Sequence, residues 1–167
     1  KRNYIYTANN RHWPVDAKYY GGRAYNNPFR GFRIDELLRA TEKHDVESFS
    51  RIQCDRQAVD ARFFVEKLSK VADIPEFKDW KFDTEDTTQA PAVYRRLMDL
   101  ILEGWQVNEF ALYKLLDQLT EKQKSEIMSF YKIAKDQIDG RKWSDMHRLT
   151  FAHLSKNDDW KFSPEIP

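Results

Sequence analysis

Cysteine is almost absent from this sequence, with Cys54 as its only representative. A single thiol excludes a disulfide within the chain and a zinc site built on cysteines, and it leaves both oxidising and reducing compartments open. We interpret Cys54 as a small apolar filler of the core. Stability must therefore come from apolar burial, for which 167 residues with 41% hydrophobic content are enough for one domain.

The sequence also lacks an excess of charge of one sign. Its 28 basic and 27 acidic residues give a net charge of +1, and both signs are mixed along the whole chain. Domains that bind nucleic acid carry a basic patch or stripe, so the charge pattern predicts no nucleic-acid partner. No apolar run approaches the roughly 18 residues of a membrane helix, and no signal-peptide pattern opens the chain. We therefore predict no membrane partner.

Neither end of the sequence has the features of a natural terminus. The first residue is Lys1 rather than Met, and the chain stops in FSPEIP, an extended stretch with prolines and no terminating element. We therefore expect the chain to be cut at both ends.

The signatures of a self-contained enzyme are missing as well. There is no G-x-S-x-G turn, no phosphate-binding glycine loop, no H-E-x-x-H and no recognisable Cys-His pair. His147 and His153 could share a metal, but no third ligand is evident. The acidic group Asp83, Glu85 and Asp86 could chelate a cation, although a solvated loop fits it better. We predict no metal site and no cofactor for this chain.

Helical periodicity is what the sequence has in abundance. The spacing of apolar residues predicts helices from residue 32 or 33 to 43, over 92–103, over 108–119, and from an N-cap at Thr120 to a stop at Gly140. Asp45 is expected to cap a further helical stretch, which is either one long helix or two with a break near Asp55. The prediction is a mainly α chain.

Three other segments lack that period. Residues 4–8, YIYTA, alternate like a short β strand, and residues 149–152 offer a second one. Residues 73–91 are acidic, contain two prolines and predict an extended connection over the surface. Residues 9–28 predict an ordered loop. The aromatic residues of this loop and of the position directly after it either line an apolar pocket or pack on their own domain: Trp13, Tyr19, Tyr20, Tyr25 and Phe29.

Four stretches carry a resemblance to a known family: YIYTANNR, PFRGFRIDELL, DVESFSRIQCDRQAVDARFFVEKL and KWSDMHRLTFAHL. In this order they cover nearly the whole chain. They resemble the middle of the β chain of the penicillin amidase family of N-terminal-nucleophile hydrolases. The most specific part is the TANN element, followed by F-R-x-x-R-I and then by I-Q-x-D with A-R downstream.

The resemblance implies the helical section of an αββα hydrolase that cleaves amides with an N-terminal Ser, uncovered by autocatalytic processing in the periplasm. Residues 1–31 would form a strand and an aromatic loop that reach the active site, 32–140 a helical domain, and 141–167 a return segment toward the core sheet. Lys1 cannot be the nucleophile. We therefore expect the nucleophile on the remaining acylase chain or chains, and this chain alone to be inactive.

The resemblance assigns Asn9 to the oxyanion hole, with its side-chain amide as the donor. The chemistry fits, because an amide is a neutral donor that does not titrate and a strand end would hold it in place. The residues alone favour a different interpretation, in which Asn9 and Asn10 form a turn at the end of the strand.

Arg30 is the second residue that the resemblance singles out, for orienting the substrate near the nucleophile. Its planar fork suits a carboxylate or an amide carbonyl. The alternative is a structural ion pair with Asp35 or Glu36. Arg33 is expected to begin the helix and to pair locally.

Calcium-binding members of the family carry a carboxylate between the Asn and the Arg. Here that loop offers Asp16, and then Tyr20, Gly21 and Gly22 near the expected position, so this segment predicts no calcium ligand. The expected substrate is a small N-acyl amide: a β-lactam side-chain amide, an acyl-homoserine lactone or another N-acyl compound.

A protein of a different class is the alternative to the acylase. In it, the chain is a free-standing helical interaction module without catalysis, whose apolar faces form a bundle with an exposed groove for a partner helix. These faces contain Leu97, Leu112, Leu116, Ile127 and Phe130.

Overall fold

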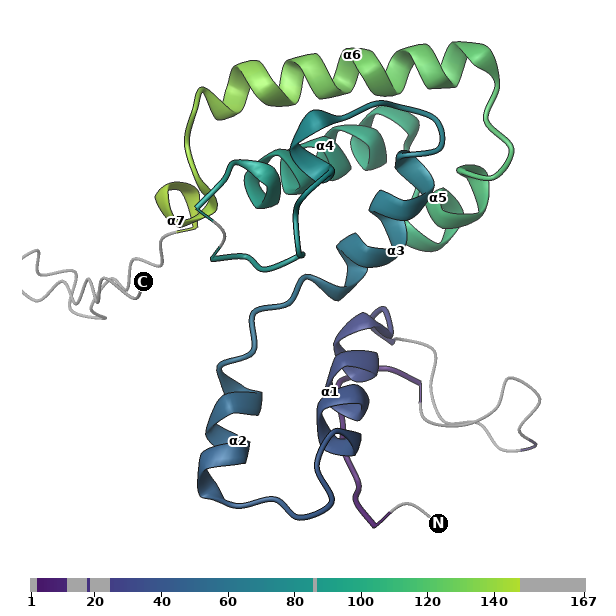
Figure 1. Cartoon of the computed structure of the whole chain (residues 1–167). Coiled ribbons are helices and arrows are strands. Elements are labelled where there is room, and N and C mark those ends of the chain that lie inside the picture. The colour runs from purple at the N-terminus through teal and green to yellow at the C-terminus, as the bar shows by residue number, and fades with distance from the viewer. Residues whose placement is uncertain (1–2, 12–17, 19–24, 86, 148–167) are drawn as a thin grey trace, which may run out of the picture.

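The computed structural model describes residues 3–11, 18, 25–85 and 87–147. Its regular elements are helices: α1 (Phe29–Arg39), α2 (Val46–Gln53), α3 (Val59–Leu68), the 3-10 helix η1 (Pro75–Phe77), α4 (Ala90–Trp105), α5 (Glu109–Leu115), α6 (Glu121–Ile138) and α7 (Trp143–Met146). The prediction of a mainly α chain is confirmed. Helices α3 to α6 pack together, and α1, α2 and the N-terminal segment form a second part beside them (Figure 1).

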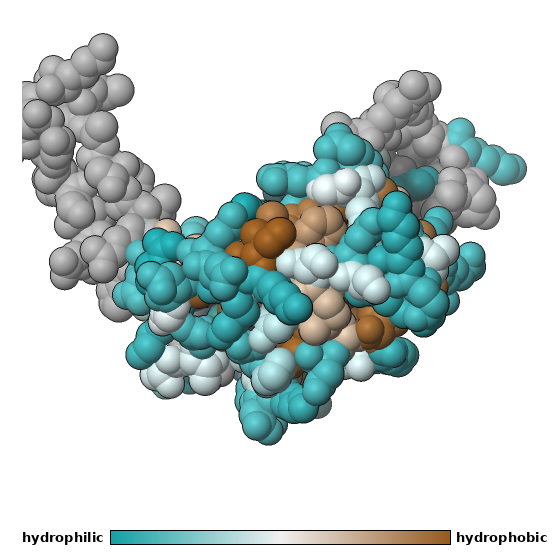
Figure 2. Space-filling model, turned by 90° about the horizontal axis from the view of Figure 1, so that it is seen from above, coloured by the Kyte–Doolittle hydropathy of each residue, from teal (hydrophilic) through white to brown (hydrophobic). Residues whose placement is uncertain are grey.

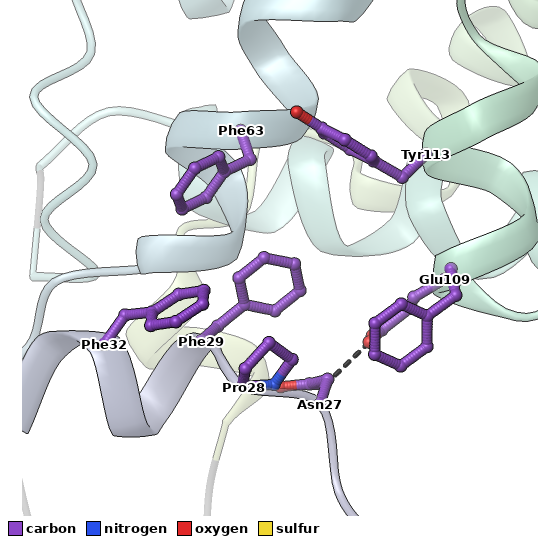
Figure 3. A pocket seen from close by; sticks show the side chains of 8 residues that line it. Asn27, Pro28, Phe29, Phe32, Phe63, Glu109 and Tyr113 are labelled. Atoms are coloured by element: carbon purple, nitrogen blue, oxygen red, sulfur yellow. Dashed lines mark hydrogen bonds between the residues drawn. The ribbon is translucent and has the colours of Figure 1, made fainter. Parts of the chain in front are cut away.

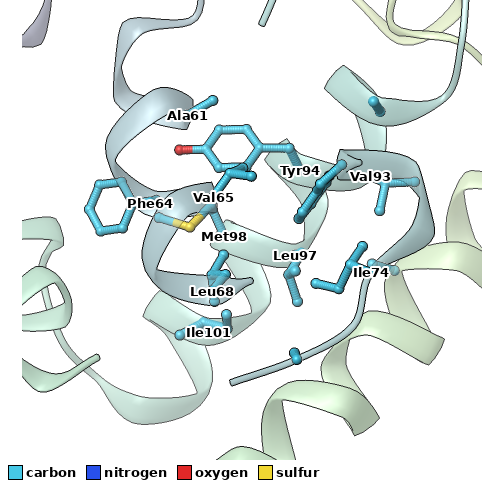
Figure 4. Packing of buried hydrophobic residues seen from close by; sticks show 14 of the residues in the cluster. Ala61, Phe64, Val65, Leu68, Ile74, Val93, Tyr94, Leu97, Met98 and Ile101 are labelled. Carbon is cyan, nitrogen blue, oxygen red and sulfur yellow. The ribbon is translucent and has the colours of Figure 1, made fainter. Parts of the chain in front are cut away.

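The hydrophobic core lies where α3, α4 and α6 meet. Phe64 and Leu68 of α3, Leu97 and Ile101 of α4, and Ile127 of α6 are completely buried. From Val93 onward, the buried positions of α4 recur three and four residues apart, which places them on one face of the helix (Figure 4). Burying a side chain of this size contributes about 1.5–3 kcal/mol, so this face holds the helices together.

The stretch between α3 and α4 differs from the extended surface connection that the sequence predicts. It contains η1, and the rings of Phe77 and Trp80 are each only 5% exposed. Both rings pack on Tyr94 of α4, with centroids 6.2 and 5.6 Å away. The prediction is wrong here because two large aromatic rings anchor this stretch without any helical period.

Three helices begin where a side chain caps them. Asp45 accepts the backbone N–H of Ser48 at 2.7 Å at the start of α2, and Asn108 caps α5. Thr120 and Gln123 cap each other at the start of α6. The predicted caps Asp45 and Thr120 are confirmed, since capping satisfies N–H groups that have no partner inside the helix. Helix α5 ends at Leu115, four residues before the predicted end at 119.

The chain between α2 and α3 answers the question of one long helix or two. Helix α2 ends at Gln53 and α3 begins at Val59. Between the two helices, the side chain of Asp55 accepts two hydrogen bonds from Arg33 of α1. The helical stretch is therefore two elements with the break at Asp55. Cys54 is exposed at this break, so its interpretation as a core filler is wrong.

The strand predicted over residues 4–8 is also wrong. The segment is extended, but no described segment pairs with it as a strand. It lies against α1 instead: the Tyr4 hydroxyl donates to Asp35 at 2.7 Å, and Arg39 donates to the Tyr4 oxygen at 3.1 Å. Alternation makes a strand possible, but a strand forms only with a hydrogen-bonding partner. The second predicted strand, residues 149–152, lies outside the described residues.

The surface mixes polar and apolar side chains. Figure 2 shows apolar side chains in the middle of the face seen from above, with hydrophilic ones around them. Within the described part of the chain, no helix combines the length and apolar character that a membrane crossing needs.

Candidate functional site

Asn9 lies at the end of the extended segment with its backbone in the left-handed region, at φ 57°. Asparagine enters this region more readily than most residues. The backbone carbonyl oxygen of Asn9 accepts the N–H of Asn26 at 2.9 Å, which joins the segment to the chain just before α1. A bend and a tertiary hydrogen bond therefore place Asn9, rather than the predicted end of a strand.

The side chain of Asn9 meets Arg30 in the first turn of α1. Nη2 of Arg30 donates to Oδ1 of Asn9 at 2.5 Å. A guanidinium has N–H donors and no acceptor, so only the oxygen of the amide can face it. The Nδ2 group of Asn9 takes no part in this hydrogen bond. The fold thus brings together the two residues that the sequence singles out, 21 positions apart.

The two carboxylates that could form an ion pair with Arg30 instead pair with other arginines. Asp35 pairs with Arg39 at 2.8 Å, and Glu36 pairs with Arg33 at 2.7 Å and with Arg62 at 3.0 Å. The local pairing predicted for Arg33 is confirmed. It does not begin the helix, however, because α1 starts at Phe29.

Arg33 ties α1 to the rest of the molecule. Its Nε and Nη2 atoms donate to the two oxygens of Asp55 at 2.8 and 2.6 Å, a bidentate geometry. The hydrogen bond with Asp55 raises the pKa of Arg33 above its ordinary value. Hydrogen bonds from Arg62 and Arg33 lower the pKa of Glu36 to about 2. This charged network fixes the helix that carries Arg30 against the start of α3.

The side chain of Asn10 packs against α1 at Gly31. Its Oδ1 atom is buried and has no hydrogen-bond partner among the described residues, while its Nδ2 donates to the Arg11 carbonyl oxygen at 3.2 Å. A Cβ atom at Gly31 would lie 2.8 Å from that Oδ1. Gly31 is not among the site residues that the sequence predicts. The signal that could have found it is a glycine inside a helical pattern, where alanine is the better helix former.

An apolar pocket of about 190 Å³ opens between α1, α3 and α5 (Figure 3). Its lining is mainly aromatic: Asn27, Pro28, Phe29, Phe32, Phe63, Glu109, Phe110 and Tyr113. The amide of Asn27 donates to Glu109 at 2.6 Å on one side. Phe29 both lines the pocket and packs on Phe64 of the core, so it fulfils both interpretations of the aromatic loop. Trp13, Tyr19 and Tyr20 lie outside the described residues.

A second, more polar hollow of about 440 Å³ is lined by residues of α1 to α5 and of the chain between them. Arg30 and Arg33 contribute to its lining, and so do Asp55 and Asp60. Asn27, Phe29 and Glu109 line both hollows. Arg30 therefore stands beside an open space that a polar group could enter.

Among the described residues, the other candidate metal ligands contact neighbouring side chains of the chain itself. Asp83 and Glu85 pair with Arg56, and Asp86 lies outside the described residues. His147 stacks on Trp143 with ring centroids 4.7 Å apart, and His153 is not described.

In the part of the chain that the structure describes, no three His, Cys, Asp or Glu side chains form a group that could hold a metal ion. Asp16 and residues 20–22, where family members would carry a calcium ligand, lie outside the described ranges.

Comparison with known proteins gives one finding of similarity. A family model described as penicillin amidase matches residues 1–165. No curated protein and no solved structure matches the chain. The matched range contains Asn9 and Arg30 together with every described helix.

Proposed function

Because the chain belongs to the penicillin amidase family, we propose that it is part of an acylase that hydrolyses N-acyl amides through an N-terminal Ser outside this chain. In this proposal Asn9 is an oxyanion donor and Arg30 orients the substrate. The observation that carries the proposal is the 2.5 Å hydrogen bond from Arg30 to the Asn9 amide oxygen.

The oxyanion role of Asn9 follows from the orientation of its amide. When the Ser hydroxyl attacks the amide carbonyl, a negative charge develops on the carbonyl oxygen. A donor that is already in place stabilises this charge without reorganising at the moment of reaction. Arg30 holds the oxygen of the Asn9 amide, so the N–H donors of that amide are left for another acceptor such as the oxyanion.

The remaining chemistry belongs to the nucleophile. The α-amine of an N-terminal Ser accepts the hydroxyl proton as the oxygen attacks, because a free α-amine has a pKa of about 8. Collapse of the tetrahedral intermediate breaks the C–N bond, and the leaving amine takes up the proton. Water then hydrolyses the ester, which releases the acid and restores the Ser. In this proposal the proton transfer is assigned to the Ser residue, and not to Asn9 or Arg30.

Arg30 has donors to spare for the substrate. Among the contacts of the described residues, Arg30 uses one N–H group on Asn9, and its exposed side chain is part of the lining of the polar hollow. A planar fork of this kind recognises a carboxylate or an amide carbonyl of the substrate.

We propose a small N-acyl amide as the substrate, with β-lactam side-chain amides and acyl-homoserine lactones as two candidate classes. The partners are the remaining acylase chain or chains, released from one precursor by autocatalytic processing, and the compartment is the periplasm.

The free-standing interaction module receives less support. Its apolar faces do form a bundle, but Leu97, Leu112 and Ile127 are fully buried inside it, so none of them lines an exposed groove.

The test is the Asn9→Ala variant of the complete protein, assayed on a panel of N-acyl-4-nitroanilides with different acyl chains. Removing a donor of this type lowers turnover about 100- to 1000-fold. Asn108→Ala is the matched control, because it removes a capping asparagine from α5 and should cost about 1 kcal/mol of stability without lowering turnover. Near-normal turnover of Asn9→Ala, or no hydrolysis of any anilide by the wild type, would contradict the proposal.

A further inference from the structure

The segment that carries Asn9 packs against α1 at a glycine. Gly31 is buried, and a Cβ added there would lie 2.8 Å from Oδ1, 3.1 Å from Cγ and 3.3 Å from Nδ2 of Asn10. The whole amide group of Asn10 therefore rests on the position where any other residue would carry a side chain.

The backbone of Gly31 does not itself require glycine. The residue lies inside α1, and among the described glycines only Gly140 has a positive φ. Alanine is the better helix former at such a position, so helix stability alone favours a side chain here. The remaining reason for glycine at this position is space, because the side chain of Asn10 occupies the place of a Cβ atom.

Two neighbouring pairs of residues meet at this point. Asn10 touches Gly31, and Asn9, directly before it, accepts the hydrogen bond of Arg30, directly before Gly31. The Oδ1 atom of Asn10 has no hydrogen-bond partner among the described residues, so its contribution here is shape rather than bonding. A methyl group at Gly31 would displace the buried end of the Asn10 side chain, and any part of that displacement that side-chain rotation does not absorb moves the adjoining Asn9 relative to Arg30.

We infer that Gly31 is a positioning residue, which sets the oxyanion donor Asn9 by letting Asn10 seat against α1. The inference rests on the proposed function and extends it to a residue that does not touch the substrate. A displacement of about 1 Å at a reacting group can lower the rate about 100-fold, so the absence of one methyl group is enough to matter.

The experiment compares kcat and KM of Gly31→Ala with those of wild type in the complete protein, on the best substrate of the N-acyl-4-nitroanilide panel. We expect kcat to fall about 10- to 100-fold while KM changes less than about threefold, because the donor acts mainly in the transition state. A second change, Asn10→Ser, removes the amide that the new methyl group meets. The double variant should regain kcat to within about fivefold of wild type.

Gly104→Ala is the matched control. Gly104 also lies inside a helix, α4, and a Cβ there would come within 2.6 Å of the Phe130 ring. This clash is in the core part of the molecule, away from Asn9. We expect Gly104→Ala to lower the thermal unfolding temperature and to leave kcat unchanged.

The outcomes separate this inference from the proposed function. If Asn9→Ala lowers turnover but Gly31→Ala does not, or if Asn10→Ser fails to restore it, Gly31 has no positioning role. If Gly31→Ala does not fold but the double variant does, the clash with Asn10 acts on folding rather than on the position of Asn9, and the inference is overturned. If neither folds, Gly31 serves the fold and the inference is overturned. Unchanged turnover in Asn9→Ala contradicts the proposed function instead.

Discussion

The part of the molecule that carries the candidate site is held together differently from the part that carries the core. Over residues 3–53, the described residues bury only Ala8, Gly31, Leu38 and Ser48. Polar side chains connect this part, through Tyr4, Arg30, Arg33 and their partners. Residues 61–138 instead contain one continuous cluster of buried apolar side chains.

This difference indicates in which part of the molecule the position of a single atom affects the candidate site. Apolar burial is non-directional and supplies most of the stability, whereas a bidentate ion pair or a hydrogen bond fixes the direction of particular groups. An oxyanion donor needs direction more than it needs stability. Changes in the core should therefore affect folding and leave the site intact, and changes in the polar part should disturb the site at a small cost in stability.

The largest expected effect on stability is that of Leu97→Ala in the core. Leu97 is fully buried in α4, and truncating such a leucine costs about 2–5 kcal/mol. Leu100, partly buried on the same helix, is the control, and Leu100→Ala should cost clearly less. Urea unfolding measures both. Equal losses of unfolding free energy in the two variants would contradict the assigned core. A lower turnover per folded molecule in Leu97→Ala would contradict the separation of the core from the site.

Arg33→Ala is expected to have a smaller effect on stability but to reach the site. It leaves Asp55, whose side chain is 16% exposed, without its bidentate partner. The loss should be about 1–2 kcal/mol, and turnover should fall because the helix that carries Arg30 is no longer fixed. Arg51→Ala breaks an exposed pair with Glu47 and should cost below about 0.5 kcal/mol. If the two variants behave alike, the polar part is not held by the Arg33 network.

Glu36→Gln should have the smallest effect, and one that depends on pH. The pKa of Glu36 is lowered from 4.5 to about 2 in the folded protein, so its charge stabilises the fold above pH 4.5 and that stabilisation is lost as the pH falls toward 2. Because the side chain is 48% exposed, the loss at neutral pH should stay below about 1 kcal/mol. Urea unfolding of both proteins between pH 7 and pH 2 measures it. A difference that grows toward low pH would contradict the assigned ion pairs.

The sequence predicts the fold well where a signal is local. Asp45 and Thr120 each meet their capping partner within three residues, and both are found as predicted. Residues 4–8 and 73–91 were predicted wrongly because their structure depends on distant partners. The first segment lies along α1, and the second is anchored by aromatic rings on α4. Neither contact leaves a periodic pattern in the sequence.

The candidate site was predictable in its residues but not in its geometry. Asn9 and Arg30 were singled out by resemblance, yet their hydrogen bond depends on how residues 4–11 run along α1. Gly31 was missed because the reason for it is a contact with Asn10, which a helical pattern alone does not reveal. The roles of these residues in catalysis, and the division of the chain at residues 31 and 140, remain predictions.

The most direct test of the account is a double-mutant cycle of Asn9→Ala and Arg30→Ala in the complete protein, with kcat/KM as the measured quantity. If Arg30 orients the Asn9 amide, each single change removes part of the same interaction. The loss in the double variant should then fall short of the product of the single losses by about tenfold or more. Losses that simply multiply would show that the two residues act independently, and would contradict the claim that Arg30 aims the oxyanion donor.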